Sequence, residues 1–176
     1  MGQSPDGNSY NDNGEGMKFY QGKTDFGMRF PSPRMYTTAP TRFAKKGDIL
    51  LSVRAPVGAL NVAMEDCCIG RGLAALNSKV GSNLHLYYTL LSLHPVFQIY
   101  NGNGTTFGSI TKENLYKMVV VIPPKDIVAV FEDYVCAVDK RIVVCEEQNR
   151  SLEAQRNWLL PLLMNGQATI KQETTK

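Results

Sequence analysis

The chain has 176 residues, of which 43% are hydrophobic, so it can bury one core but has little room for a second independent one. Its formal net charge of +3 is too small to identify a partner by itself. No run approaches the roughly 20 apolar residues that cross a bilayer, and the first residues lack the charged and apolar regions of a signal peptide. We therefore expect no membrane segment and a soluble protein of the cytoplasm.

Strands are expected where apolar and β-branched residues form short runs between turn residues. Residues 3–15 are rich in Gly, Ser, Asn and Asp and are typical of an exposed loop. The runs that follow predict strands at residues 17–21, 48–53, 60–64, 73–76 and 118–122.

Two short helices are predicted from their first residues. Ser82 and Asn83 offer an N-cap for an apolar helix over residues 84–93, which Pro95 should stop. Thr111 can cap a second helix that has Glu113 in its first turn. Strands and helices alternate without a regular βαβ repeat, so the fold class is α+β, a globular domain with a twisted mixed β-sheet and short helices.

A long helix is predicted after Pro124. Residues 126–160 contain neither Gly nor Pro, and apolar residues recur there with alternating steps of four and three, which is a heptad pattern. Because such a helix is roughly 50 Å long at 1.5 Å per residue, one small domain cannot cover it, and it needs a partner helix. The alternative is a long helix packed against its own domain. The seam consists of Phe131, Val135, Val138, Ile142, Cys145, Asn149, Leu152 and Leu159.

Three segments follow from these patterns. Residues 1–124 form the globular domain, and residues 125–166 form the long helix for spacing and assembly. Residues 167–176 are a polar tail that we expect to be disordered.

Signs of catalysis or of a bound cofactor are weak. His85 and His94 lie in or beside an apolar helix, where a packed histidine is far more common than a general base. Cys67 and Cys68 have no companion base in any known signature and no C-x-x-C spacing for zinc. We predict no catalytic residues, no metal site and no cofactor, and an enzyme centred on Cys67 or Cys68 ranks third among the possible functions.

Positive charge is concentrated in the first third of the chain. From Lys18 to Arg54 there are eight Lys or Arg against two acids, a net charge of +6, whereas residues 126–160 have four against seven, a net of −3. A basic globular part joined to a slightly acidic helix suits a polyanion-binding domain on a stalk.

Polar and basic residues of the predicted loops are those that DNA contacts require. Arginine reads guanine and glutamine reads adenine with paired hydrogen bonds, while Ser, Thr and Lys hold phosphates. The candidates for DNA binding are Gln3, Ser4, Gln21, Lys23, Arg29, Arg34, Arg54, Arg71, Thr105, Thr106, Ser109 and Lys112.

Longer strings narrow the interpretation. GDILLSVRAPVG at residues 47–58 and CIGRGLAA at 68–75 resemble the central stretch of recognition domains in specificity subunits of type I restriction-modification systems. MGQSP at 1–5, FYQGK at 19–23 and TFGSIT at 106–111 are also similar to the family, and WLLPLLMNGQ at 158–167 resembles the end of its conserved helical region. The resemblance covers almost the whole chain in the correct order.

The resemblance implies recognition and scaffolding rather than catalysis. In this family two recognition domains, held apart by two antiparallel helices, each read one half of a split target in double-stranded DNA. Methyltransferase (modification) subunits bind the helices and DNA, and a restriction subunit joins them to cleave unmethylated DNA.

Two departures from the family pattern affect this expectation. The chain has one recognition domain and one helix, and it begins where family members usually have a preceding conserved stretch. It is therefore a fragment or a half-subunit, and a half-subunit is expected to form a homodimer through antiparallel long helices. The competing function is a coiled-coil adaptor whose globular head binds protein rather than DNA.

Overall fold

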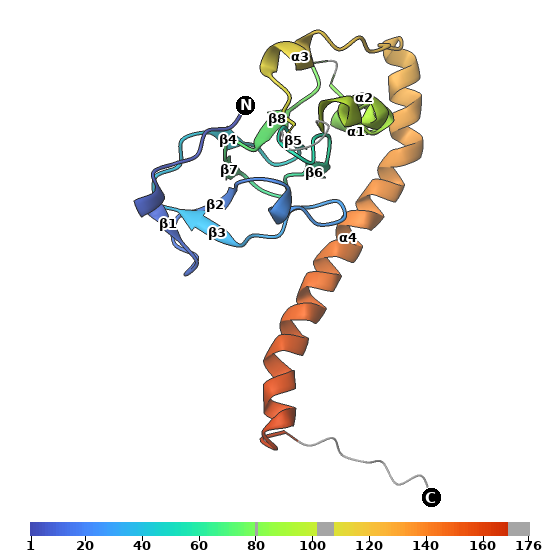
Figure 1. Ribbon diagram of the computed structural model, residues 1–176. Coiled ribbons are helices and arrows are strands. Elements are labelled where there is room, and N and C mark those ends of the chain that lie inside the picture. Colours follow the sequence, from blue (N-terminus) through green and yellow to red (C-terminus); the bar gives the residue numbers. More distant parts are fainter. Residues whose placement is uncertain (80, 102–107, 169–176) are drawn as a thin grey trace, which may run out of the picture. The chain divides into compact units, whose positions relative to one another are not determined.

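The computed structural model of the protein describes residues 1–79, 81–101 and 108–168. The chain divides into two compact units, Met1–Glu132 and Asp133–Lys176. The first unit contains the strands and the short helices, and the second contains most of the long helix (Figure 1).

The first unit has two sheets. The larger is mixed, because β2 and β7 run parallel while its other pairs are antiparallel. In the smaller sheet β5 lies between β6 and β8, antiparallel to both. The larger sheet has the order β1 (Tyr10–Asn11), β3 (Met35–Thr37), β2 (Met17–Tyr20), β7 (Cys67–Ile69), β4 (Phe43–Ala44), and the smaller has β6 (Leu60–Val62), β5 (Ile49–Ser52), β8 (Leu73–Leu76).

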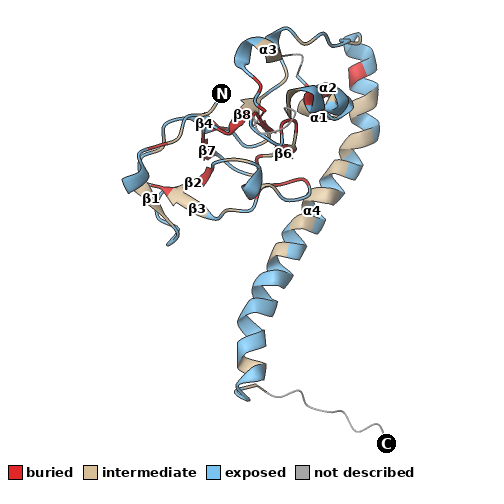
Figure 2. Ribbon diagram, viewed as in Figure 1, coloured by how far each residue is buried: buried red, intermediate tan, exposed pale blue. Residues whose placement is uncertain are grey.

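Strand β5 lies between two hydrophobic clusters. Ile49 and Leu51 belong to one cluster and Leu50 to the other, and all three side chains are fully buried. This follows from the period of two in a strand, which points successive side chains to opposite faces. The buried stretches gather in the sheet region of the first unit (Figure 2).

Short helices cover the first cluster. Helix α1 (Asn83–Ser92) contributes Tyr87 and Leu90, and α2 (His94–Gln98) contributes Phe97. The predicted cap of α1 is confirmed, because the Ser82 hydroxyl oxygen accepts a hydrogen bond from the His85 N–H at 3.0 Å. The remaining short elements are α3 (Lys112–Tyr116) and the 3-10 turns Gly7–Ser9, Lys23–Asp25 and Ile99–Asn101.

Both predicted helix starts are confirmed, but the role of Pro95 differs from the prediction. The Thr111 side chain caps α3 by accepting from the Asn114 N–H at 3.2 Å. Pro95 lies in the first turn of α2 instead of merely ending α1. A proline is tolerated there because the first N–H groups of a helix have no partner within the helix.

The long helix α4 spans Lys125–Met164, which confirms the helix predicted after Pro124. Most of its residues are exposed or half-buried (Figure 2). It contains Pro161 close to its C-terminal end. Gln167 and Ala168 then donate backbone hydrogen bonds to the Leu162 carbonyl at 2.8 and 3.1 Å, and residues 169–176 of the predicted disordered tail lie outside the described residues.

The strand predicted at residues 118–122 is wrong. This stretch belongs to no strand, and Val119 and Val121 remain 90% and 87% exposed. β-Branched residues favour an extended backbone, but a strand also needs a neighbour to accept its hydrogen bonds. The α+β class is confirmed, although the strands form two sheets rather than one. The sequence interpretation also missed β1, β3, β4 and β7, of which β1 and β3 occur in segments rich in Gly, Pro or Ser.

Within the described part of the chain, no helix combines the length and apolar character needed to cross a bilayer.

Gly58 provides a stability test with a matched control. Gly47 and Gly58 both have a positive φ, of 86° and 94°, but a Cβ on Gly58 would lie 2.4 Å from the Phe97 Cβ, whereas a Cβ on Gly47 meets open space. Gly47→Ala should cost about 1 kcal/mol for the backbone alone, and Gly58→Ala should cost about 1–3 kcal/mol more for overpacking. Equal losses in the free energy of unfolding, measured with urea, would show that Phe97 does not constrain Gly58.

Candidate nucleic-acid interface

A cleft of about 510 Å³ opens on the first unit, between three loops that are distant in the sequence. The first loop follows β2, the second follows β5, and the third connects β7 to β8. The residues that line the cleft are Gln21, Gly22, Lys23, Thr24, Ser52, Arg54, Ala55, Pro56, Arg71 and Gly72.

The loop after β2 is held by a buried carboxylate. Asp25 is only 7% exposed, and its Oδ2 accepts hydrogen bonds from the Gln21 N–H at 2.7 Å and the Gly22 N–H at 3.3 Å. The Asp25 N–H in turn donates to the Gly22 carbonyl at 3.1 Å. These bonds close a tight turn, so that Gln21 and Lys23 project from an ordered backbone.

The loop after β5 presents Arg54 and is fixed on both sides. The Ala55 N–H donates to the Gly108 carbonyl at 3.0 Å, and the Ile110 N–H donates to the Val53 carbonyl at 2.9 Å. The Ser52 hydroxyl donates to the Arg54 carbonyl at 2.9 Å. Arg54 itself is exposed, so its guanidinium is available to a partner while its backbone is held in place.

The loop that carries Arg71 is pinned by backbone hydrogen bonds to two neighbours. The Gly70 N–H donates to the Tyr20 carbonyl at 2.8 Å, and the Val53 N–H donates to the Gly72 carbonyl at 2.9 Å. A Cβ on Gly72 would lie 2.5 Å from the Gln21 carbonyl oxygen, so only glycine permits this close approach of the two loops. The three loops therefore form one connected rim.

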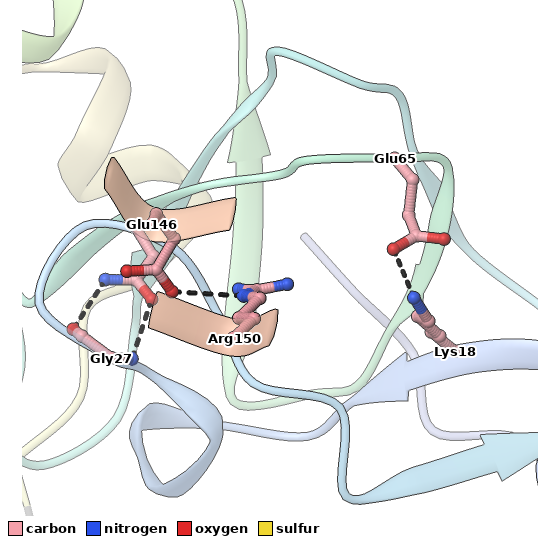
Figure 3. Close-up of polar contacts among 6 residues, drawn as sticks. Lys18, Gly27, Glu65, Glu146 and Arg150 are labelled. Atoms are coloured by element: carbon pink, nitrogen blue, oxygen red, sulfur yellow. Dashed lines mark hydrogen bonds and ion pairs between the residues drawn. The ribbon is translucent and has the colours of Figure 1, made fainter. Parts of the chain in front are cut away.

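The cleft is electropositive. Lys23, Arg54 and Arg71 supply three cations, and none of the lining residues is acidic. Lys18, from the same basic segment, is instead engaged by Glu65 in an ion pair outside the cleft (Figure 3). Cations and amide or hydroxyl groups in one concave site suit a ligand with phosphates and hydrogen-bonding edges.

Four of the predicted DNA-binding residues line the cleft, namely Gln21, Lys23, Arg54 and Arg71. Three more predicted residues are linked to lining residues by a hydrogen bond or a backbone bridge. The Ser4 Oγ accepts from the Arg71 N–H at 3.4 Å, and Arg34 donates to the Thr24 carbonyl at 3.4 Å.

Ser109 lies beside the cleft, whereas Gln3 bonds to residues that do not line it. The Gln3 N–H donates to the Ile69 carbonyl at 3.0 Å, and its carbonyl accepts from the Thr41 hydroxyl at 2.6 Å. Ser109 forms an antiparallel bridge with Arg54. Thus the structure brings together seven of the twelve predicted residues around this cleft.

Besides Gln3, two further predicted residues, Arg29 and Lys112, do not line the cleft. Arg29 is only 9% exposed, and its guanidinium lies 3.7 Å from the centre of the Tyr87 ring, so the surface contact expected of it is not supported. Lys112 lines a different cavity, beside Tyr116. Thr105 and Thr106 lie outside the described residues.

Thr24 and Ser52 line the cleft but were not among the predicted residues. Thr24 lies in a five-residue turn that begins at Gln21 and is closed by Asp25. The aspartate four residues after Gln21 could have predicted this turn, and with it the position of Thr24. Ser52 ends an otherwise apolar strand. A hydroxyl at the end of such a strand indicates a side chain that hydrogen-bonds to the following loop, as Ser52 does to the Arg54 carbonyl.

The two adjacent cysteines are buried, and the two histidines contact neighbouring side chains. Cys67 and Cys68 are fully buried. Burial raises the pKa of the Cys67 thiol to about 12, so Cys67 carries almost no nucleophilic thiolate near neutral pH. His85 packs edge-on against Phe131, and a His94 ring nitrogen lies 2.8 Å from Gln98 Nε2. Across residues 1–79, 81–101 and 108–168, no group of three or more His, Cys, Asp or Glu could hold a metal ion.

Comparison with known proteins identifies the family. Residues 37–153 match the model of the type I restriction modification DNA specificity domain. This chain belongs to that family. The match covers the loops that carry Arg54 and Arg71, together with most of α4.

Relatives of this specificity domain are longer than the chain. A protein of Methanocaldococcus jannaschii, assigned as the specificity subunit of the type I restriction enzyme MjaX, is 37% identical over 97% of this chain and 40% of its own length. A solved structure from work on complex assembly and conformational transition of the type I R-M system has a TM-score of 0.69 and 38% identity, over 90% of this chain and 40% of that one. The HsdS subunit from Thermoanaerobacter tengcongensis has a TM-score of 0.67 and 39% identity, over 82% and 35%.

The buried Cys67 thiol gives this specificity domain a testable pH dependence. Because the folded pKa of about 12 exceeds the ordinary value of 9.0, the neutral thiol's contribution to stability is complete below pH 9 and is lost as pH rises toward 12. The free-energy difference between the wild type and Cys67→Ala should therefore shrink above pH 9 by up to about 1.4 kcal/mol per pH unit.

Leu50→Ala is the control for this measurement, since Leu50 lies in the same cluster and its truncation opens a cavity without removing a titratable group. Its free-energy difference from the wild type should stay constant over pH 7–10.5. Urea unfolding at several pH values measures both free-energy differences. If the difference for Cys67→Ala also stayed constant over this pH range, burial would not raise the pKa of the Cys67 thiol as the structure indicates.

Proposed function

We propose that this chain recognises one half of a bipartite target in double-stranded DNA, as the specificity component of a type I restriction-modification complex. The observation that carries the proposal is the cleft, where Gln21, Lys23, Arg54 and Arg71 from three loops meet without an acidic neighbour in the lining. Family membership supports the same conclusion. No observation favours the protein-binding adaptor.

The cleft suits both kinds of DNA contact. Arg54 and Arg71 are exposed on ordered backbone, as paired hydrogen bonds to guanine O6 and N7 require. Gln21 is placed to read adenine in the same way, while Lys23 and Thr24 suit phosphate oxygens. Loops held by backbone hydrogen bonds lose little conformational entropy on binding, which favours selection between similar sequences.

The partners of the proposed complex are modification (methyltransferase) subunits, a restriction subunit and a second recognition unit. Since the chain spans about two-fifths of the length of the curated relative it matches, these partners follow from its relationship to longer proteins. Helix α4 provides the assembly surface, and two copies of the chain form a homodimer through antiparallel α4 helices. The chain itself is not an enzyme, and its complex acts in the cytoplasm, where chromosomal DNA lies.

The cleft can be tested by removing its two arginines. The variant Arg54→Ala/Arg71→Ala, assembled with its modification subunits, should bind random-sequence duplex DNA at least tenfold more weakly at low salt. Because two positive charges leave the cleft, the slope of log affinity against log salt should also become shallower. Fluorescence anisotropy at several salt concentrations measures both quantities.

Lys45→Ala/Lys46→Ala is the matched control. It removes the same charge from two exposed residues of the first unit that do not line the cleft. A general effect of net charge would weaken DNA binding equally in both variants, and that result would refute the cleft as the DNA-binding site.

A further inference from the structure

The backbone of Gln21 is held on two sides. Its N–H donates a hydrogen bond to Oδ2 of the buried Asp25 at 2.7 Å. On the side of the neighbouring loop, a Cβ on Gly72 would lie 2.5 Å from the Gln21 carbonyl oxygen, and a Cβ on Gly70 would lie 3.1 Å from the Gln21 Cα. The loop that carries Arg71 therefore packs directly against Gln21, and the point from which the Gln21 side chain starts has little freedom to move.

The first backbone donors of this turn are already used within the protein. The Gln21 and Gly22 N–H groups both donate to Asp25 Oδ2, at 2.7 and 3.3 Å. Successive N–H groups in a turn often bind a phosphate, but here the carboxylate of Asp25 occupies that position. Its negative charge also opposes a phosphate at the same place. At Gln21, the side-chain amide is therefore the group left to meet a ligand in the cleft.

The Gln21 amide suits a base edge better than a phosphate. The side chain is exposed and lines the cleft beside Lys23, Arg54 and Arg71. Because an amide has no net charge, it adds little to the attraction of phosphates, which the three cations supply. It carries one donor and one acceptor side by side, and adenine is the base whose own major-groove edge presents the complementary pair, the N6 amino group and N7.

We infer that Gln21 is a specificity-determining residue that reads one adenine of the half-site through N6 and N7, and that Asp25 is its positioning residue. The inference rests on the proposed function and adds which residue selects which base. Lys23 comes from the same turn, but its ammonium group is a point charge on a flexible stem, so it contributes affinity for any sequence. Base preference at one position thus distinguishes these two neighbours.

Asp25 acts on the DNA only through the turn. Its side chain is 7% exposed and does not line the cleft. The main chain of Asp25 is itself anchored, since its N–H donates to the Gly22 carbonyl at 3.1 Å and its carbonyl accepts from the Ser32 N–H at 2.8 Å. A pair of hydrogen bonds to one base needs both bonds aligned at once. A shift of the Gln21 backbone should therefore weaken discrimination between bases more than total affinity.

Replacing single atoms of the DNA tests the contact directly. The chain, assembled with its modification subunits, is first given a randomised duplex pool to find the enriched motif. Each adenine of the motif is then replaced in turn by 7-deazaadenine, which lacks the N7 acceptor but still pairs with thymine. One replacement should weaken binding by the wild type about fivefold and binding by Gln21→Ala less than about twofold. Competition measured by fluorescence anisotropy gives both ratios.

Gln21→Glu should produce a new preference, which misfolding would not. A carboxylate accepts hydrogen bonds but does not donate them, so this variant should prefer cytosine, whose N4 amino group donates, where the wild type prefers adenine. Lys23→Ala is the control from the same turn. It should bind every duplex more weakly and keep the preference for adenine at that position.

Two variants of Asp25 test the positioning role. Asp25→Ala should lose the preference for adenine at the position that depends on Gln21 and keep the preferences at the other positions of the motif. Asp25→Asn should restore most of the lost preference, because its amide oxygen can accept from the same two N–H groups. Loss of preference throughout the motif in Asp25→Ala, or no restoration in Asp25→Asn, would overturn this role.

The assignment of Gln21 and the recognition function can fail separately. A wild-type motif in which the effect of 7-deazaadenine never depends on Gln21 would overturn the assignment and leave the recognition function standing. Equal losses of affinity on every duplex for Gln21→Ala would do the same, because they indicate a phosphate contact. A pool from which the wild type selects no motif would overturn the recognition function and this inference with it.

Discussion

The burial of β5 on both faces is the constraint on which the recognition surface depends. Ile49 and Leu51 lie in one cluster and Leu50 in the other, so a slip of one residue would exchange their environments. Because burial fixes the register of β5, it also fixes the position at which the following loop begins. Arg54 comes two residues after the end of β5, and the Val53 N–H holds the Gly72 carbonyl beside Arg71. The same buried strand thereby positions both arginines of the cleft.

Much of the fold was predictable because its signals are local. Strand β8, the caps of α1 and α3 and the long helix follow from periodicity and capping residues, which need no knowledge of distant contacts. The short strands β1, β3 and β4 exist because a neighbouring strand accepts their hydrogen bonds, and this pairing has no signature in their own residues. The stretch at residues 118–122 shows the converse, since its β-branched residues extend the backbone but no strand pairs with it among the described residues.

The candidate site was predictable in residue type but not in arrangement. Arg54 and Arg71 are polar, basic residues in predicted loops, and both line the cleft. Arg29 has the same character in the sequence, yet it is buried against Tyr87, because a guanidinium can stack on an aromatic ring as readily as it meets DNA. Whether an arginine faces solvent depends on packing between segments far apart in the chain, and composition does not contain that information.

Selection from a randomised duplex pool tests the central claim most directly. The wild-type chain, assembled with its modification subunits, is incubated with the pool at two salt concentrations, and the retained DNA is sequenced. We expect enrichment of a split motif with two identical, inverted halves. Arg54→Ala/Arg71→Ala should lose the base preference, since base contacts decide selection. An unselected pool despite salt-dependent binding, or the same motif from the double variant, would contradict that claim.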